Sequence, residues 1–279
     1  MAFYHLYTDG RYQPIIFKEE SDFVFGMNAV AMSVLHCKVR IFAFTLMDNH
    51  VHFVVDGDSS EAGKFIRNYK WRLSNHFNWK FVEKGSGMKE IFGSYHLKIA
   101  IAYCLRNPFV AGMVPHPCRY QWSSAGGCFT LPGNDRSRDV LKRVGELGVR
   151  ERRKLFLTRQ EIPEDYLFDD KGMILPSCYV AIAEVERLFS NKGNYYHYLF
   201  RRVEGMVDGE ASGNVRIASL SDNVLVEGVL ELLSAHGRRK KFCELSPDER
   251  DGLIKELRYQ YNPSDKQLAR VMGSLASWQ

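Results

Sequence analysis

The sequence predicts an α+β sandwich in which an antiparallel sheet carries helices on one face, followed by a mainly helical C-terminal region. In the first 110 residues, short β-prone segments alternate with longer segments of helical spacing, in the order β-α-β-β-α-β-α. The turn signal Asp48-Asn49 joins two apolar segments that would pair as a hairpin. From residue 131 onward the pattern is mostly helical, without an internal repeat.

Four segments have the composition of strands. Residues 3–8 are aromatic and β-prone and end at the turn signal Asp9-Gly10. Residues 39–47 are strongly apolar and predict a buried strand, and residues 51–55 predict its hairpin partner. A short fourth strand is expected over residues 91–97, after a glycine-rich turn.

Three segments have helical spacing. Residues 19–35 predict the first helix, with Ser21 as its candidate N-cap. Residues 60–77 predict the second helix, since their large apolar side chains recur every four residues. The third helix contains Tyr103 and is expected to stop at Pro108, because proline cannot continue a helix smoothly.

The second half is expected to begin after a Pro/Gly-containing linker at residues 131–135, which divides the chain into regions 1–130 and 131–279. Ser246-Pro-Asp-Glu249 has the form of a capping box. Ser264 to Gln267 repeats that logic, and Gly273 stands where a C-terminal glycine is expected. The two helices could form part of a nucleic-acid-binding helix-turn-helix, or they could simply pack against each other.

Composition excludes several classes of protein. Hydrophobic residues make up 45% and charged residues 25% of the chain, which is typical of a folded globular protein. We expect no membrane span and no secretory signal, and therefore a cytoplasmic protein. The cysteines have no zinc-finger spacing and are expected to be free thiols. They are Cys37, Cys104, Cys118, Cys128, Cys178 and Cys243.

Positive charge gathers in two places. Residues 134–159 contain nine Lys/Arg and four Asp/Glu, and residues 238–241 are all basic. Such patches suit a polyanion such as nucleic acid, although a solvated helix face has the same composition. The candidate nucleic-acid-binding residues are Arg136, Arg138, Lys142, Arg143, Arg150, Arg152, Arg153 and Lys154.

Two histidines flank a valine at His50-Val51-His52, inside an apolar segment. On a strand, residues i and i+2 point to the same face, so the two imidazoles would lie side by side. Burying imidazoles without partners costs about 1–3 kcal/mol each, and a divalent metal would remove that cost. The alternative is a pair of satisfied core histidines.

Tyr103 and Asn107 are four residues apart, so they share one face of the third helix. A phenol is a weak nucleophile at neutral pH and needs a cation or base nearby to attack phosphorus, so a core role is the alternative for Tyr103. Asn107 offers an amide oxygen as a third metal ligand beside His50 and His52. Two nitrogens and one oxygen favour Mg²⁺ or Mn²⁺ over a closed zinc site.

Two motifs carry a family resemblance. Thr45-Leu-Met-Asp-Asn-His-Val-His-Phe-Val-Val55 resembles the metal-binding motif of the HUH superfamily. The segments 103–114 and 120–124 resemble the tyrosine motif of its single-tyrosine transposases, more narrowly the REP-associated tyrosine transposase branch. The likeness covers residues 1–130 and includes Phe3 to Tyr7; Asp48 stands where the family usually has proline.

The resemblance implies a ferredoxin-like antiparallel sheet and a divalent metal, Mg²⁺ or Mn²⁺, held by His50, His52 and Asn107. It also implies that Tyr103 attacks a DNA phosphate, which gives a 5′-phosphotyrosine and a free 3′-OH. The implied partner is single-stranded or hairpin DNA, bound by a monomer or a homodimer. Basic grooves and aromatic platforms would help such binding, and Trp71, Trp79 or Trp122 would serve unless they pack in the core.

The sequence leaves three functions open. The leading one is a metal-dependent DNA strand transferase or nickase. The second is a domesticated descendant that binds hairpin DNA or RNA without cleaving it. The third is a protein-interaction module that kept only the fold.

Overall fold

A computed structural model describes residues 2–81, 86–129, 141–200, 222–235, 242–261, 263 and 265–276. Its centre is a four-stranded sheet with the order β2-β3-β1-β4, in which every neighbouring pair is antiparallel. The strands are β1 (Ala2–Thr8), β2 (Arg40–Leu46), β3 (Val51–Gly57) and β4 (Ser86–Ile91). The mixed α+β fold class and the β2–β3 hairpin are thus confirmed.

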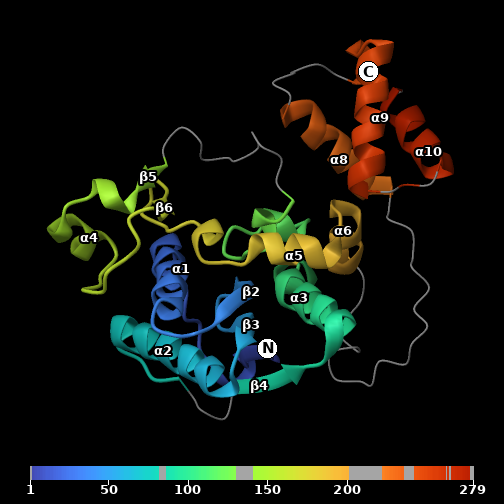
Figure 1. Ribbon diagram of the computed structural model, residues 1–279. Helices are drawn as coiled ribbons and strands as arrows, with labels where there is room; N and C mark the ends of the chain where they lie inside the picture. The colour runs from blue at the N-terminus through green and yellow to red at the C-terminus, as the bar shows by residue number, and fades with distance from the viewer. Residues whose placement is uncertain are drawn as a thin grey trace.

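Helices lie on both faces of this sheet (Figure 1), whereas the sequence predicts them on one face only. On one face, α1 (Glu20–Val34) and α2 (Ser59–Phe77) pack as the sequence predicts, and Phe53 of β3 meets Phe65 of α2 with ring centroids 5.1 Å apart. On the other face lies α3 (Gly93–Val110), which shares a buried cluster with Val54. β3 therefore divides its side chains between two packed layers.

The fourth strand and third helix meet earlier than expected. β4 ends at Ile91, and the expected strand over residues 91–97 is wrong because α3 already starts at Gly93. Gly93 has a φ of 76°, a left-handed conformation that favours glycine, and it lies where the chain leaves the strand. The chain needs only one residue, Phe92, to change from sheet to helix.

The third helix also continues past Pro108, to Val110, so the predicted stop is wrong. Proline has no N–H to donate to the carbonyl of Cys104, four residues earlier. The side-chain amide of Asn107 donates to that carbonyl over 3.4 Å and to the carbonyl of Tyr103 over 2.7 Å. This substitute donor lets the last turn tolerate the proline.

The outer edge of β2 is covered by later parts of the chain. Leu46 N donates to the carbonyl of Trp122 over 2.9 Å, and Ser124 N donates to the carbonyl of Phe44 over 3.0 Å. Further along the same edge, Ala181 N donates to the carbonyl of Ile41 over 2.8 Å. The segment around Trp122, part of the tyrosine motif, therefore has a structural role here.

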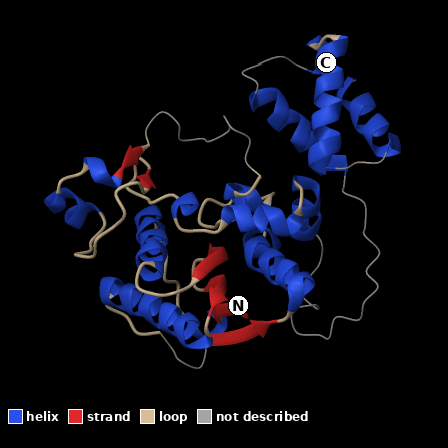
Figure 2. Cartoon of the chain, viewed as in Figure 1, coloured by secondary structure: helices blue, strands red, loops and turns tan. Residues whose placement is uncertain are grey.

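The second half of the described chain is mostly helical (Figure 2). Its elements are β5 (Lys142–Arg143), α4 (Val149–Leu155), β6 (Leu167–Phe168), α5 (Ile182–Phe189), α6 (Lys192–Phe200), α8 (Asp222–Ala235), α9 (Pro247–Tyr261) and α10 (Asp265–Ala276). Side chains from α3, α5, α6, α8 and α9 belong to one buried cluster. The boundary at residue 130 stays a prediction, and the linker 131–135 lies outside the described residues.

Three capping predictions have different outcomes. The capping box of α9 is confirmed, since Glu249 N donates to Ser246 Oγ over 3.3 Å and Ser246 N to Glu249 Oε2 over 2.9 Å. Ser21 is not the cap of α1, because Glu19 occupies that position. Gly273 does not end α10, which continues to Ala276, and Ser264 lies outside the described residues.

Within the described residues, no helix combines the length and the apolar character that a membrane span requires.

Candidate active site

The four residues singled out from the sequence line one cavity. Its volume is about 540 Å³, and it lies between α3 and the strands β1 and β3. Tyr103 and Asn107 enter it from the helix, and His50 and His52 enter it from the start of the hairpin strand. We call it the tyrosine–histidine cavity.

His52 is a buried member of this group and contacts a third imidazole. Its side chain is 6% exposed, and its Nδ1 lies 3.1 Å from Nε2 of His5 on β1, so one ring donates to the other. Burial, reinforced by the neighbouring His5 and His50, holds the pKa of His52 well below its usual value. His52 is therefore a neutral imidazole at neutral pH, which is the form that binds metals.

His50 lies in the turn just before β3 rather than in the strand itself. Its Nδ1 lies 2.7 Å from Oδ1 of Asn49, whose amide in turn donates to the carbonyl of Gly10 over 3.1 Å. A Cβ on Gly10 would come within 2.9 Å of His50 Nδ1 and 2.7 Å of Asn49 Oδ1. Only glycine at this position leaves room for both side chains. Burial lowers the pKa of His50, against the opposing influence of Asp48 and Asp9.

The Tyr103 ring stands edge-on to two of the imidazoles. Its centroid lies 5.5 Å from that of His52 and 5.6 Å from that of His5, with interplanar angles of 85° and 80°. The side chain is partly buried rather than enclosed in the core. The ring of Tyr103 therefore contacts two imidazoles of the cavity and also packs against the buried cluster that includes α3.

Three side chains of the cavity carry donor atoms of the kind that a divalent cation can bind. Among the described residues no group of three or more His, Cys, Asp or Glu side chains is placed to hold a metal ion, so the amide of Asn107 has to complete any such set. Its Nδ2 is bound to the helix backbone, which leaves Oδ1 as the available ligand atom. His50 and His52 both use Nδ1 for a neighbouring side chain, which leaves Nε2 for a cation.

Sequence reasoning missed several residues of this cavity. His5 and Tyr7 alternate along β1 as His50 and His52 do along their segment, and this period-2 spacing was the available signal. Lys89 pairs with His5 across β1 and β4, and its Nζ lies 6.0 Å from the Tyr7 ring centroid. That neighbour follows only from the strand order.

Two cations, Lys89 and Arg11, line the tyrosine–histidine cavity. Arg11 lies 2.6 Å from a carboxylate oxygen of Asp9, and this hydrogen bond lowers the pKa of Asp9. Lys89 lies on the exposed part of β4. The lining therefore carries two cations and one carboxylate, and the charge of Arg11 is compensated by Asp9.

The predicted nucleic-acid-binding residues fall into three groups. Lys142 and Arg143 form β5, and Arg150, Arg153 and Lys154 lie on α4; all five are exposed. Arg152 is instead bound within the protein, since it donates to the carbonyls of Leu147 over 2.8 Å and of Gly145 over 3.2 Å. Arg136, Arg138 and the basic run 238–241 lie outside the described residues.

The tryptophans proposed as platforms differ in exposure. Trp122 is 7% exposed and stacks on Phe23 with centroids 4.9 Å apart, so it belongs to the core. Trp79 is partly buried against Phe81. Trp71 on α2 is 60% exposed, which leaves it the best placed of the three to contact a partner.

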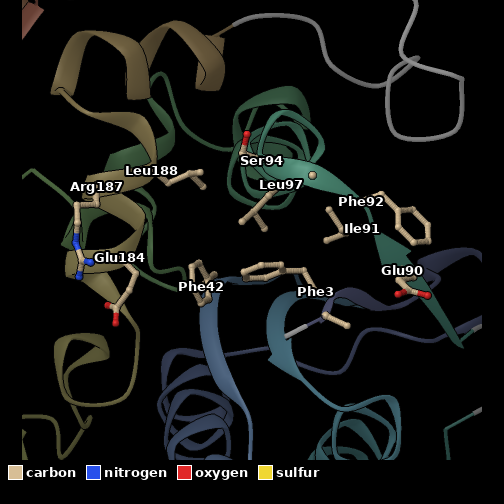
Figure 3. Close-up of a pocket in the computed structure, with 12 residues that line it drawn as sticks. Phe3, Phe42, Glu90, Ile91, Phe92, Ser94, Leu97, Glu184, Arg187 and Leu188 are labelled. Atoms are coloured by element: carbon tan, nitrogen blue, oxygen red, sulfur yellow. The ribbon is translucent and has the colours of Figure 1, made fainter.

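A larger cavity, of about 690 Å³, lies at the other end of α3. Figure 3 shows Phe3 and Phe42 of the sheet below Leu97 of α3 and Leu188 of α5. Its lining is mainly apolar and includes neither a histidine nor a tyrosine. We call it the apolar cavity; its lining lacks the groups that the candidate chemistry needs.

Comparison with known proteins gives little beyond this geometry. No protein-family model and no curated protein matches the chain. A solved structure of a REP-associated tyrosine transposase bound to a REP hairpin is similar in part, with 13% sequence identity and a TM-score of 0.38. The match covers 44% of this chain and 76% of that one.

Proposed function

We propose that this protein cleaves and rejoins one strand of DNA through a covalent link to Tyr103, in the manner of single-tyrosine HUH transposases. The observation that carries the proposal is the convergence of Tyr103, Asn107, His50 and His52 on one cavity. Tyr103 and Asn107 lie about fifty positions after His50 and His52 in the sequence, and the two pairs come from different elements. A core role for each would not require a shared solvent-accessible space.

The reaction is a transesterification at phosphorus. The Tyr103 hydroxyl attacks the phosphodiester, the bond from phosphorus to the 3′ oxygen breaks, and a 5′-phosphotyrosine and a 3′-hydroxyl result. The proton of the phenol leaves to solvent as the departing 3′ oxygen takes one up. The reverse attack by a 3′-hydroxyl restores the DNA and frees the tyrosine, so no external energy source is needed.

Each side chain has a defined part in this reaction. His50, His52 and Asn107 would hold a divalent metal, Mg²⁺ or Mn²⁺, which when bound supplies charge stabilisation for the phosphate oxygens. Asn49 and His5 hold the two metal-binding imidazoles through Nδ1. Lys89 and Arg11 would attract the DNA backbone to the cavity mouth.

The test uses a 5′-labelled and a 3′-labelled hairpin oligonucleotide with a single-stranded flank. Incubation with Mn²⁺ should give a protein-DNA adduct on a denaturing gel that carries only the label on the 3′ side of the cut. Tyr103→Phe should abolish the adduct, whereas Tyr95→Phe, a tyrosine of the same helix outside the cavity, should retain it.

The outcomes separate the functions that the sequence leaves open. An adduct with Tyr103→Phe would contradict the assignment of the nucleophile. Salt-sensitive binding without any adduct would favour a non-cleaving hairpin binder. Absence of binding to DNA and RNA would favour an interaction module.

A further inference from the structure

A third cavity lies on the opposite face of the sheet from the tyrosine–histidine cavity. It has a volume of about 550 Å³ and is enclosed by α1, α2 and residues 156–160. Its apolar part comes from Phe25, Met32 and Phe156, and its size falls in the range of ordinary small-ligand pockets. We call it the Trp71 cavity, after the tryptophan at its rim.

The ionisable side chains that line the Trp71 cavity are all basic. Arg72, Arg159, His36 and His76 line it, and none of its described lining residues is acidic. Arg72 donates to Oε1 of Gln160 over 2.6 Å. The exposed guanidinium of Arg159 makes no ion pair with any residue that the structure describes, so it is available to an anionic ligand.

The rim also offers groups suited to a planar ring. Trp71 is 60% exposed, one of the most exposed large apolar side chains among the described residues. One turn further along α2, Asn75 presents an amide at the same cavity, and no hydrogen bond to that amide occurs within the described part of the chain. An aromatic face, an amide and a cation together match a nucleobase with its phosphate.

The wall of the Trp71 cavity is itself held in an unusual shape. Leu157 has a φ of 48°, the left-handed region that non-glycine residues rarely adopt, and its side chain is 59% exposed. This wall follows directly on α4, with its exposed Arg150, Arg153 and Lys154. A strand that leaves the cavity along this wall would therefore meet further positive charge.

We propose that the Trp71 cavity binds one nucleotide of single-stranded DNA, with its base against Trp71 and its phosphate at Arg159. The proposal rests on the proposed DNA-processing function and adds a second contact, remote from the scissile phosphate. Its role is to hold a flanking single strand while Tyr103 acts on the opposite face of the sheet.

The test measures binding without cleavage. Full-length protein carrying Tyr103→Phe is titrated in EDTA against a fluorescein-labelled oligo(dT), and anisotropy gives the affinity. Loss of one base stack is worth about 1–3 kcal/mol, so adding Trp71→Ala should weaken binding by about 5- to 150-fold. Arg159→Ala should weaken binding less and lower the slope of log affinity against log salt by about one phosphate contact.

Matched controls come from the apolar cavity. Phe92→Ala removes another exposed aromatic side chain and Arg187→Ala another exposed arginine, and both should leave the affinity within about twofold. Trp71→Phe keeps an aromatic face and should recover most of the lost affinity. Circular dichroism melts of every variant check that folding is unchanged.

Three results would overturn the proposal. The first is an affinity for oligo(dT) that Trp71→Ala leaves unchanged. The second is free dTMP that binds as tightly as oligo(dT), which would make the cavity a mononucleotide site. The third is competition by an acidic peptide of equal charge as strong as that by DNA.

The two proposals can fail separately. If wild-type protein forms the Tyr103 adduct but its DNA affinity is insensitive to Trp71, only the Trp71 cavity proposal fails. If binding depends on Trp71 but no adduct forms, only the proposed cleavage fails.

Discussion

The two faces of the central sheet differ in the polarity of the buried side chains that β3 presents to each of them. Towards α1 and α2, β3 presents Val51, Phe53 and Val55, all fully buried and apolar. Towards α3 it presents Val54, which is also apolar and fully buried. On either side of Val54, His52 and Asp56 are 6% and 3% exposed and are bonded to His5 and Arg40. Since buried polar groups cost stability unless they are satisfied, the α3 face of β3 is the one whose side chains need specific polar partners.

The apolar face should be where stability is most sensitive. Phe53 meets Phe65 and Tyr69 with centroids 5.1 Å from each. Phe53→Ala should lower the free energy of unfolding by about 3–5 kcal/mol, through lost burial and the cavity left behind. Urea denaturation measures this. A loss below about 1 kcal/mol would show that this face does not carry the core.

The layer on the α3 side should make stability depend on acid pH. His116 is 4% exposed and lies against Tyr196 and Phe200 of α6. Burial, with smaller contributions from Arg119 and Lys192, lowers its pKa to about 4. The unfolded chain, with the ordinary pKa near 6.5, binds the proton first, so stability is complete above pH 6.5 and falls as the pH approaches 4.

The loss from His116 should reach about 3 kcal/mol at pH 4. It is measured as the difference in urea stability between pH 7 and pH 4. His116→Gln should reduce that difference by about 3 kcal/mol, whereas substitution of the exposed His36 to Gln should leave it unchanged. If His116→Gln loses as much stability between pH 7 and pH 4 as the wild type, the pH dependence comes from other groups.

The contacts behind the imidazoles should tune metal affinity. Asn49→Ala removes the partner of His50 Nδ1 and should weaken Mn²⁺ binding by about 10- to 100-fold, because the ring loses its fixed orientation. Isothermal titration calorimetry without DNA gives this value. Asn194→Ala, an exposed asparagine of α6, is the control and should bind Mn²⁺ like the wild type. Unchanged Mn²⁺ affinity in Asn49→Ala would show that the contact between Asn49 and His50 does not contribute to metal binding.

The polar face should tolerate loss of its key hydroxyl. Tyr103 is only partly buried, and its ring contacts would survive in Tyr103→Phe. The free energy of unfolding should change by less than about 1 kcal/mol, the net value of one hydrogen bond. A much larger loss in urea denaturation would mean that the hydroxyl is structural.

The sequence predicted those features that depend on local patterns. The hairpin, the buried series on α2 and the shared helix face of Tyr103 and Asn107 all follow from periodicity and turn residues. The contact of His5 with His52 was out of reach, because it depends on β1 lying beside β3. The passage of α3 through Pro108 needed a side-chain donor that no propensity describes.

The Trp71 cavity is a further feature that local sequence patterns could not predict. Its walls come from residues about 130 positions apart, and only the packing of residues 156–160 on α1 and α2 brings them together. The basic run before it was visible in the sequence, but Arg152 proved to be an internal anchor. The composition showed where the basic residues gather in the sequence, but it could not show which of them are bound within the protein.

Locating the covalent bond between protein and DNA would identify the nucleophile. Protein trapped on an oligonucleotide with Mn²⁺ is digested with nuclease and trypsin, and the modified peptide is sequenced by mass spectrometry. We expect a nucleotide on the hydroxyl of Tyr103. A nucleotide on Tyr7, the other tyrosine lining the cavity, would contradict it, as would the failure of every oligonucleotide to become attached.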